Sequence, residues 1–126
     1  MPVSNIPDGV RRFLLGAIPS VPHLEALLLL RGAPNQSWSA DALAARLYVD
    51  AAAAATLLAD LSQRGLAAPS DAGMQYGPRD ATLAAVVDAL AGVYARHVVE
   101  VTELIHSSSD QKARRFADAF RLRKEP

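Results

Sequence analysis

The sequence predicts a mainly α-helical domain that carries a small sheet of two or three strands. Apolar residues recur at helical spacing in successive stretches, and several of these stretches begin directly after a capping residue. Two short segments flank the turn signal Ser70-Asp71-Ala72-Gly73, which is typical of paired strands. A chain of 126 residues is long enough for one buried core and too short for two ordinary domains.

Composition sets limits on the partners and on the compartment. Thirteen basic and thirteen acidic residues give zero net charge, so no global field attracts nucleic acid or a membrane surface. The chain has no cysteine, which excludes disulfides and thiolate chemistry. The start lacks the basic and apolar regions of a secretory signal, and the run Leu27 to Leu30 is too short to cross a bilayer. We therefore expect a cytoplasmic protein with no membrane partner.

Two helices are predicted in the first third of the chain. Asp8 is a candidate N-cap for a helix from Gly9 to Ile18, which Pro19 ends. Ser20 is a candidate N-cap for the next helix, from Val21 to Arg31, and Gly32 ends it.

The middle third predicts two further helices and a hairpin. Trp38 is expected to form a short strand, and Ser39 caps a helix from Ala40 to Leu47. Asp50 caps a second helix that ends at Arg64 and Gly65. Leu66-Ala67-Ala68 is the expected first strand, followed by the turn from Ser70 to Gly73 and a second strand.

From Ala81 to His106 the chain carries its longest periodic pattern. A heptad seam across this segment predicts one long helix, about 40 Å by the usual rise per residue. Such a helix is too long for the small domain to cover, so we expect it to pair with a second copy of the chain. The seam consists of Leu83, Val87, Leu90, Tyr94, His97, Val101 and Leu104.

The last helix is expected to begin after a break at Ser107-Ser108-Ser109. Ala113, Phe116, Ala117 and Phe120 form a narrow apolar stripe within it. Around the stripe lies a basic tail of Lys112, Arg114, Arg115 and Arg121. The tail either contacts phosphates or is a solvated face of a helix that docks by its aromatic residues, and we favour the second interpretation.

The motifs SADALAARLYVD and LLADLSQRGL, followed by a strand, a glycine turn and a strand, resemble the winged helix-turn-helix superfamily. The resemblance is to compact bacterial transcriptional regulators similar to the MarR and PadR groups. It implies a winged core with an N-terminal helix over residues 1–80 and a helical dimerisation region over 81–126, joined in one compact domain. It also implies a homodimer in which the helix after Asp50 reads DNA and Ser70 to Gly73 forms the wing tip.

The reading positions depart from that pattern. A reader helix needs side chains that match base-edge donors and acceptors, and alanine supplies none. Asp60 on the same helix would be repelled by phosphate, and few basic residues lie nearby, where specific complexes use about 6–10 phosphate contacts. The candidate contacts to DNA or to a partner are Ala51, Ala52, Ala55, Thr56 and Gln63, with Arg46, Arg64 and Arg79. DNA binding is therefore expected to be weak.

The alanine tract itself has two interpretations. Alanine has the best helix propensity, so the tract is explained by a well-formed helix alone. Alternatively, its small side chains allow another helix to approach closely. We expect a dimeric regulatory module in transcription, with protein contact more important than DNA reading; an ordinary sequence-specific DNA-binding dimer is the alternative.

Other functional classes receive little support. His23, His97 and His106 are widely spaced and match no metal motif, so no cofactor or metal is expected. No catalytic motif is visible, so an enzyme is not expected. A ligand-sensing domain stays open, because Trp38, Tyr48 and Tyr94 are candidates to line an apolar pocket.

Overall fold

A computed structural model describes residues 4–124 of the chain, with side chains described for residues 4–119. The described part is mainly helical with one small antiparallel sheet, which confirms the predicted fold class at that level. The elements are α1 (Asp8–Ala17), α2 (Val21–Gly32), α3 (Ala40–Leu47), α4 (Ala51–Gln63), β1 (Ala67–Ser70), β2 (Gly73–Tyr76), α5 (Ala81–Arg96) and α6 (Val98–Lys124).

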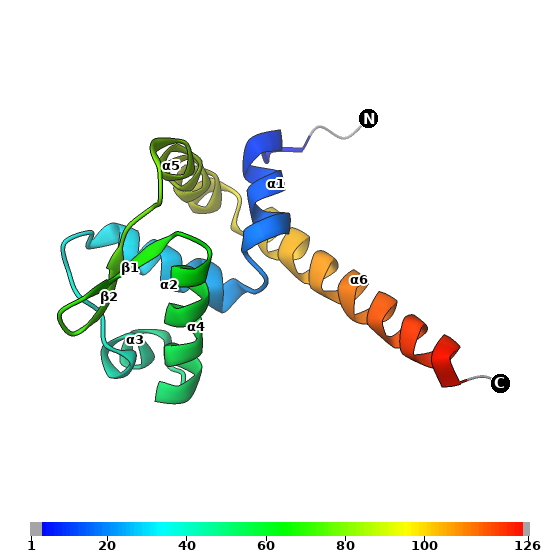
Figure 1. The fold of residues 1–126 in the computed structure, drawn as a ribbon. Helices are drawn as coiled ribbons and strands as arrows, with labels where there is room; N and C mark the ends of the chain where they lie inside the picture. The colour runs from blue at the N-terminus through cyan, green and yellow to red at the C-terminus, as the bar shows by residue number, and fades with distance from the viewer. Residues whose placement is uncertain (1–3, 125–126) are drawn as a thin grey trace.

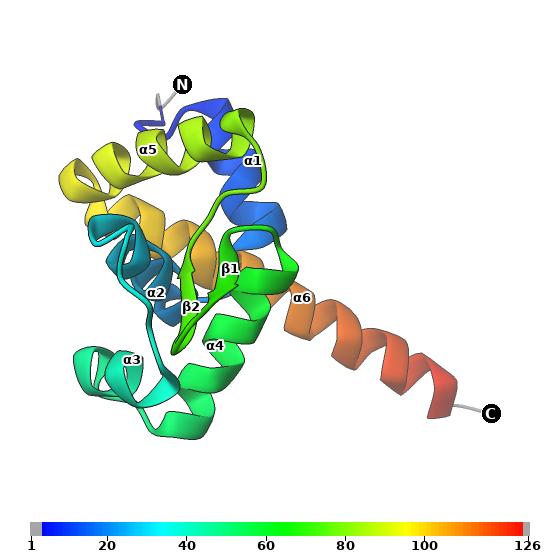
Figure 2. The same cartoon turned by 60° about the vertical axis from the view of Figure 1, so that its left-hand side comes forward.

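Helix α2 lies at the centre of the molecule (Figures 1 and 2). It contacts α3, α4 and β2 on one side and α6 on the other. One hydrophobic cluster runs through all of these elements, from Ile6 to Ile105. Its largest fully buried side chains include Leu24, Leu27, Leu30, Leu43, Leu61, Leu66, Leu90 and Trp38.

Most predicted helix starts are confirmed by side-chain caps. The hydroxyl oxygens of Ser20 and Ser39 accept hydrogen bonds from the backbone N–H groups of His23 and Ala42. The carboxylate of Asp50 accepts from Ala53 at 2.7 Å. Asp8 is different: α1 begins at Asp8 itself, after Pro7, and no side chain caps it. The carboxylate lies in the first turn, where the helix dipole still favours it.

The predicted hairpin and the short strand predicted at Trp38 are also present. β1 and β2 pair antiparallel, with Ala67 opposite Tyr76 and Ser70 opposite Gly73. Trp38 forms an isolated bridge to Met74, so the sheet has a short third edge. The first strand begins one residue later than predicted, at Ala67, and extends to Ser70, where it pairs with Gly73.

The prediction of one helix from Ala81 to His106 is wrong. The chain bends by 113° between α5 and α6, and His97 has a non-helical backbone. The backbone N–H of His97 donates to Val93, and its carbonyl accepts from Val101, so this residue closes one helix and opens the next. The bend returns Val101 and Ile105 to the core, where both are buried. A straight helix would carry them away from that core.

The predicted break at Ser107-Ser108-Ser109 is also wrong. Helix α6 continues through the three serines, since serine is only a moderate helix former and neither glycine nor proline interrupts the segment. Its second half projects away from the rest of the molecule (Figures 1 and 2). Every side chain from Ser109 to Ala119 is exposed.

Candidate interaction surfaces

The first candidate surface is the exposed side of α3 and α4. The two helices cross with a bend of 108°, and their connection passes through Tyr48 and Val49. Ala54, Leu57, Leu58 and Leu61 bury the opposite side of α4 in the core, as their spacing predicts. The remaining side of the helix is left to solvent.

Toward the start of α4 this exposed side consists mainly of alanine methyl groups, and Gln63 lies at its far end. Thr56 is its one hydroxyl near the helix start, and that group donates to the carbonyl of Ala52 on its own helix at 3.1 Å. The start of the helix therefore presents little that can pair with a base edge. Five predicted contact residues lie on this side of α4 and all are exposed: Ala51, Ala52, Ala55, Thr56 and Gln63.

Tyr48 projects from the corner between the two helices. It has φ 58° and ψ 43°, the left-handed conformation that disfavours any side chain with a Cβ atom. Its side chain is 94% exposed, so no packing compensates for that backbone. Asp41 and Asp50 are exposed on the same two helices. We define the α4 face as Tyr48, Ala51, Ala52, Ala55 and Thr56.

Asp60 does not belong to that exposed side, contrary to the expectation from sequence. Its carboxylate is half-buried and lies 2.8 Å from Nε2 of His23 on α2. Nδ1 of the same ring lies 2.6 Å from the hydroxyl oxygen of Ser20, the cap of α2. The three side chains tie α4 to α2 by a route that sequence spacing does not reveal, because His23 and Asp60 are 37 positions apart.

This Ser20–His23–Asp60 network is structural in its geometry. The serine oxygen already accepts the backbone N–H of His23 at 3.3 Å, as a helix cap does. The serine hydroxyl can donate to a neutral ring or accept from a charged one, so the network is satisfied in either protonation state.

The three arginines predicted to contact a partner separate into two places. Arg46 lies over the ring of Trp38, with its guanidinium carbon 5.8 Å from the ring centroid. Arg64 donates to the backbone of Asp60 at 3.3 Å. Arg79 donates its backbone N–H to Gly65, next to Arg64. The structure therefore brings Arg64 and Arg79 to one end of α4 and leaves Arg46 on α3.

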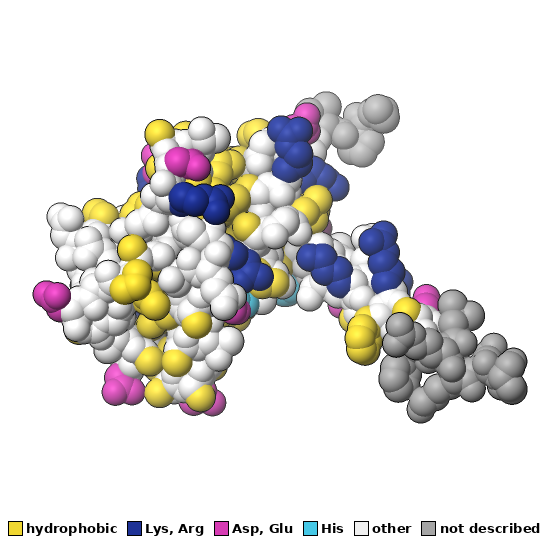
Figure 3. All heavy atoms as spheres, in the orientation of Figure 1, with side chains coloured by type: hydrophobic (Ala, Val, Ile, Leu, Met, Phe, Trp, Pro, Cys, Tyr) yellow, Lys and Arg dark blue, Asp and Glu magenta, His cyan; other side chains and the backbone are white. Residues whose placement is uncertain are grey.

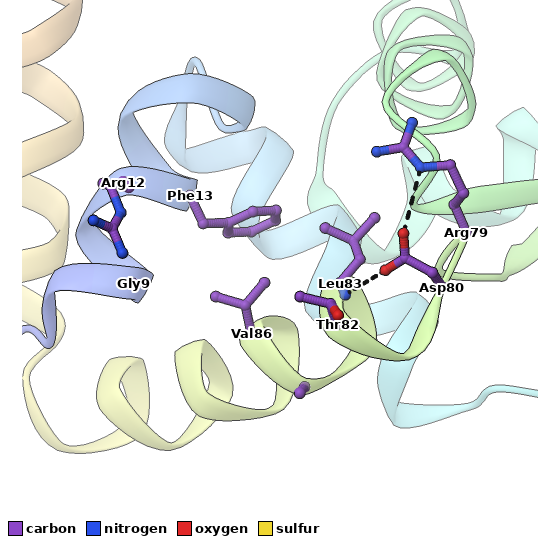
Figure 4. A pocket seen from close by; sticks show the side chains of 9 residues that line it. Gly9, Arg12, Phe13, Arg79, Asp80, Thr82, Leu83 and Val86 are labelled. Atoms are coloured by element: carbon purple, nitrogen blue, oxygen red, sulfur yellow. Dashed lines mark hydrogen bonds and ion pairs between the residues drawn. The ribbon is translucent and has the colours of Figure 1, made fainter.

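An open cleft of about 590 Å³ separates α1 from the start of α5. Figure 4 shows Phe13, Leu83 and Val86 between Arg12 at one end and Arg79 at the other. Asp80 lies beside Arg79 at 3.9 Å and also caps α5 by accepting from the backbone of Leu83. The sequence does not predict this cleft, because Arg12 and Arg79 come to line the same cleft only through the packing of α1 on α5.

The predicted dimer seam is not one surface. Val87, Leu90 and Val101 are fully buried within the chain, and the bend at His97 divides the remaining members between two helices. Leu83, Tyr94, His97 and Leu104 are half-buried. Three of the five exposed large apolar side chains of the described residues lie on α6 outside the seam, namely Val98, Val99 and Phe116.

The basic tail occupies the projecting half of α6. Lys112, Arg114 and Arg115 are exposed there. The side chain of Arg121 lies outside the residues whose side chains the structure describes. Lys112 donates to the backbone carbonyl of Leu15 on α1 at 3.4 Å, so the start of the tail adjoins α1. Phe116 is not buried by the body of the chain, contrary to one interpretation of its stripe.

The three aromatic residues predicted to line a ligand pocket do not meet. Trp38 is buried, at 2% exposure, and Tyr48 faces solvent. Tyr94 does line an open cleft of about 380 Å³, with Glu25, Leu28 and Arg46 among its other walls. Burial raises the pKa of Tyr94, and the Glu25 carboxylate adds to that shift, while a hydrogen bond with Thr102 opposes it.

The described part of the chain brings together no group of three histidine, aspartate or glutamate side chains that could hold a metal ion. Among the same residues, no single helix has both the length and the apolar composition to cross a membrane, although three bent helix pairs reach both when taken together. No protein family model, curated protein or solved structure matches this chain.

Proposed function

We propose that this chain is a dimeric winged-helix regulatory module of transcription that acts in the cytoplasm and contacts a protein through its α4 face. The observation that carries the proposal is the chemistry of that face. Methyl groups and one projecting tyrosine stand where a DNA reader presents hydrogen-bonding side chains. Apolar small residues around an exposed aromatic ring suit a protein partner better, because tyrosine is enriched in such interfaces.

The arrangement of elements supports the winged-helix part of the proposal. α3 and α4 cross at a steep angle through a short turn, and the β1–β2 hairpin follows α4 directly. Trp38 pairs with Met74 and joins the segment before α3 to the hairpin. A helix pair followed by a wing is the layout that this superfamily uses.

Helix α6 supports the dimeric part. With 27 residues it is about 40 Å long, and its second half extends beyond the body (Figure 1). An exposed helix of this length carries an unburied apolar stripe at Ala113, Phe116 and Ala117. A second copy of the chain is the partner that would cover it by symmetry.

One observation favours the alternative, a sequence-specific DNA-binding dimer. Arg64 and Arg79 lie together at the C-terminal end of α4, where they would supply phosphate contacts if α4 were a reader helix. They would position such a helix on DNA, but they would not read bases. In the alternative, base reading would therefore depend on the exposed alanines of α4, which would face the major groove of DNA.

Site-specific photo-crosslinking in living cells tests the proposal. A photoreactive residue replaces Ala55 on the α4 face, and in a matched control it replaces Ala89, which is exposed on α5. We expect a discrete protein adduct from position 55 and none from position 89. An adduct with DNA from position 55, without a protein adduct, would establish the alternative.

A further inference from the structure

Basic side chains gather on one face of the molecule, over α1, the C-terminal end of α4, the segment that leads into α5, and α6 (Figure 3). The net charge of zero does not reveal this arrangement, because it sums over the whole chain. The acidic residues that balance the basic ones include Asp41 on α3, Asp50 at the start of α4 and Asp71 in the hairpin turn. Backbone contacts and one shared cleft relate the basic residues to one another across the four elements.

The first step joins Arg64 to Arg79. Gly65, which follows Arg64, has φ +74°, and a Cβ atom there would stand 3.1 Å from Cβ of Arg79. The carbonyl of Gly65 accepts the backbone N–H of Arg79 at 2.7 Å. Arg79 therefore lies directly over the end of α4, with its side chain 69% exposed.

The second step joins Arg79 to Arg12. Both line the cleft between α1 and α5, and Figure 4 shows them at its two ends. Phe13, Leu83 and Val86 form an apolar wall between them, and the polar side chains of Asp80 and Thr82 also line the cleft. A linear polyanion that follows this face can therefore contact both guanidinium groups, and the one carboxylate among the lining residues, Asp80, lies next to Arg79 and accepts the backbone N–H of Leu83.

The third step joins Arg12 to α6. Leu15 lies one turn after Arg12, and its carbonyl accepts the ammonium group of Lys112 at 3.4 Å. Arg115 follows Lys112 by one turn on the same helix and is exposed. We define the basic band as Arg12, Arg64, Arg79, Lys112 and Arg115.

Two of the carboxylates close to this band are already engaged. Asp60 is bonded to His23, and Asp80 caps α5 while it lies 3.9 Å from Arg79. Asp8 on α1 and Asp110 and Asp118 on α6 are exposed and reduce the local charge in part. The band still holds more cations than free carboxylates, and it spans four elements.

We propose that the basic band binds the phosphate backbone of duplex DNA without reading its sequence. A band spread over four elements fits an extended polyanion, since a single phosphate or carboxylate ligand would engage only one or two of its cations. Four of the five cations are arginines, which bind phosphate through two parallel N–H groups. The inference is independent of the role proposed for the α4 face, because the band includes none of its residues.

The test is a salt titration with random-sequence duplex DNA, using the full chain. Each phosphate contact contributes about 0.9 to the slope of log K against log salt, so five contacts predict a slope of about −4 to −5 per protomer. R12E/R79E should weaken binding at least about tenfold at about 50 mM salt and reduce the slope by about 2. A circular-dichroism melt checks that the variant folds, and R12Q/R79Q replaces it if it does not.

The control R46E/R96E changes net charge by the same amount, away from the band. Arg46 lies over Trp38, and Arg96 lies at the opposite end of α5 from the cleft. This control should retain the slope of the native chain. Three results would overturn the inference: no duplex binding by the native chain at about 50 mM salt, equal weakening by R46E/R96E, or competition by polyglutamate as strong as by DNA.

Discussion

At the scale of single residues, Tyr48 shows how the chain retains an unfavourable backbone at an exposed position. A left-handed residue with a Cβ atom costs about 1–2 kcal/mol, and its exposed ring recovers none of this by burial. Such strain is concentrated at functional sites. Tyr48→Gly should therefore raise the free energy of unfolding by about 0.5–1 kcal/mol, measured by urea denaturation, while it removes the crosslink from position 55.

Tyr48→Ala is the matched control for that variant. It removes the ring but keeps a Cβ atom, so stability should stay near that of the native chain while partner contact is lost. If Tyr48→Gly is no more stable than Tyr48→Ala, the left-handed backbone carries no strain. If both retain the crosslink, the ring is not part of the contact.

Gly73 is required by close backbone approach. A Cβ atom there would stand 2.0 Å from the carbonyl oxygen of Trp38. Gly73→Ala should separate Trp38 from Met74, break their two backbone hydrogen bonds and cost about 2–4 kcal/mol in thermal or urea unfolding.

Gly92→Ala is the corresponding control on α5. The nearest atom to an added Cβ is 3.8 Å away, so this change should stabilise the helix by about 0.5–1 kcal/mol. A Gly73→Ala variant as stable as the native chain would show that Trp38 does not pair with the hairpin.

Glu100 supplies a pH dependence. Hydrogen bonds from the side chain and backbone of Asn5 lower its pKa, and His97 acts in the same direction. A lowered folded pKa contributes stability that is present above the unfolded value, about 4.5, and is lost as the pH falls through the folded value. The native chain should thus lose more Tm between about pH 6 and pH 3 than Glu100→Gln.

Glu103→Gln, one turn along the same helix, should keep the native pH profile. Equal acid sensitivity in the native chain and in Glu100→Gln would contradict the bond between the N-terminal segment and α6.

At the scale of elements, local signals predicted most of the fold. The caps Ser20, Ser39 and Asp50 act within three residues of themselves, so their patterns are readable without tertiary structure. The break at His97 was not predictable in this way. The heptad pattern continues across this position. The bend is favoured only because it buries Val101 and Ile105 against the earlier helices.

The candidate sites follow the same division. The methyl-rich side of α4 can be predicted from residue spacing alone, because the opposite side is defined by the apolar core positions Ala54, Leu57, Leu58 and Leu61. The His23–Asp60 contact and the neighbourhood of Arg12 and Arg79 depend on how distant segments pack. Residue spacing within a single helix or strand therefore cannot predict either of these two features.

Helix α6 yields a prediction about self-association. Phe116→Asp places a charge in the exposed apolar stripe, and burial of a phenylalanine is worth about 1.5–3 kcal/mol per copy. The dimer dissociation constant, measured by sedimentation equilibrium, should rise at least about tenfold. Ser109→Asp, before the stripe, should change it little. A native chain that stays monomeric at all concentrations would contradict the dimer.

At the scale of the whole molecule, the α4 face and the basic band consist of different residues, and we propose a different partner for each. The α4 face is methyl-rich and adjoins exposed aspartates, which disfavours phosphate. The basic band crosses α1, α4, α5 and α6 and suits the DNA backbone. We therefore propose that charge holds the chain on DNA and that the α4 face contacts a protein.

The central claim is that the α4 face does not read bases, and selection of binders from a random duplex pool tests it most directly. We predict that no sequence motif is enriched, and that A52L/A55L binds random duplex as the native chain does. An enriched motif bound about a thousandfold or more above random duplex, and lost in A52L/A55L, would contradict it.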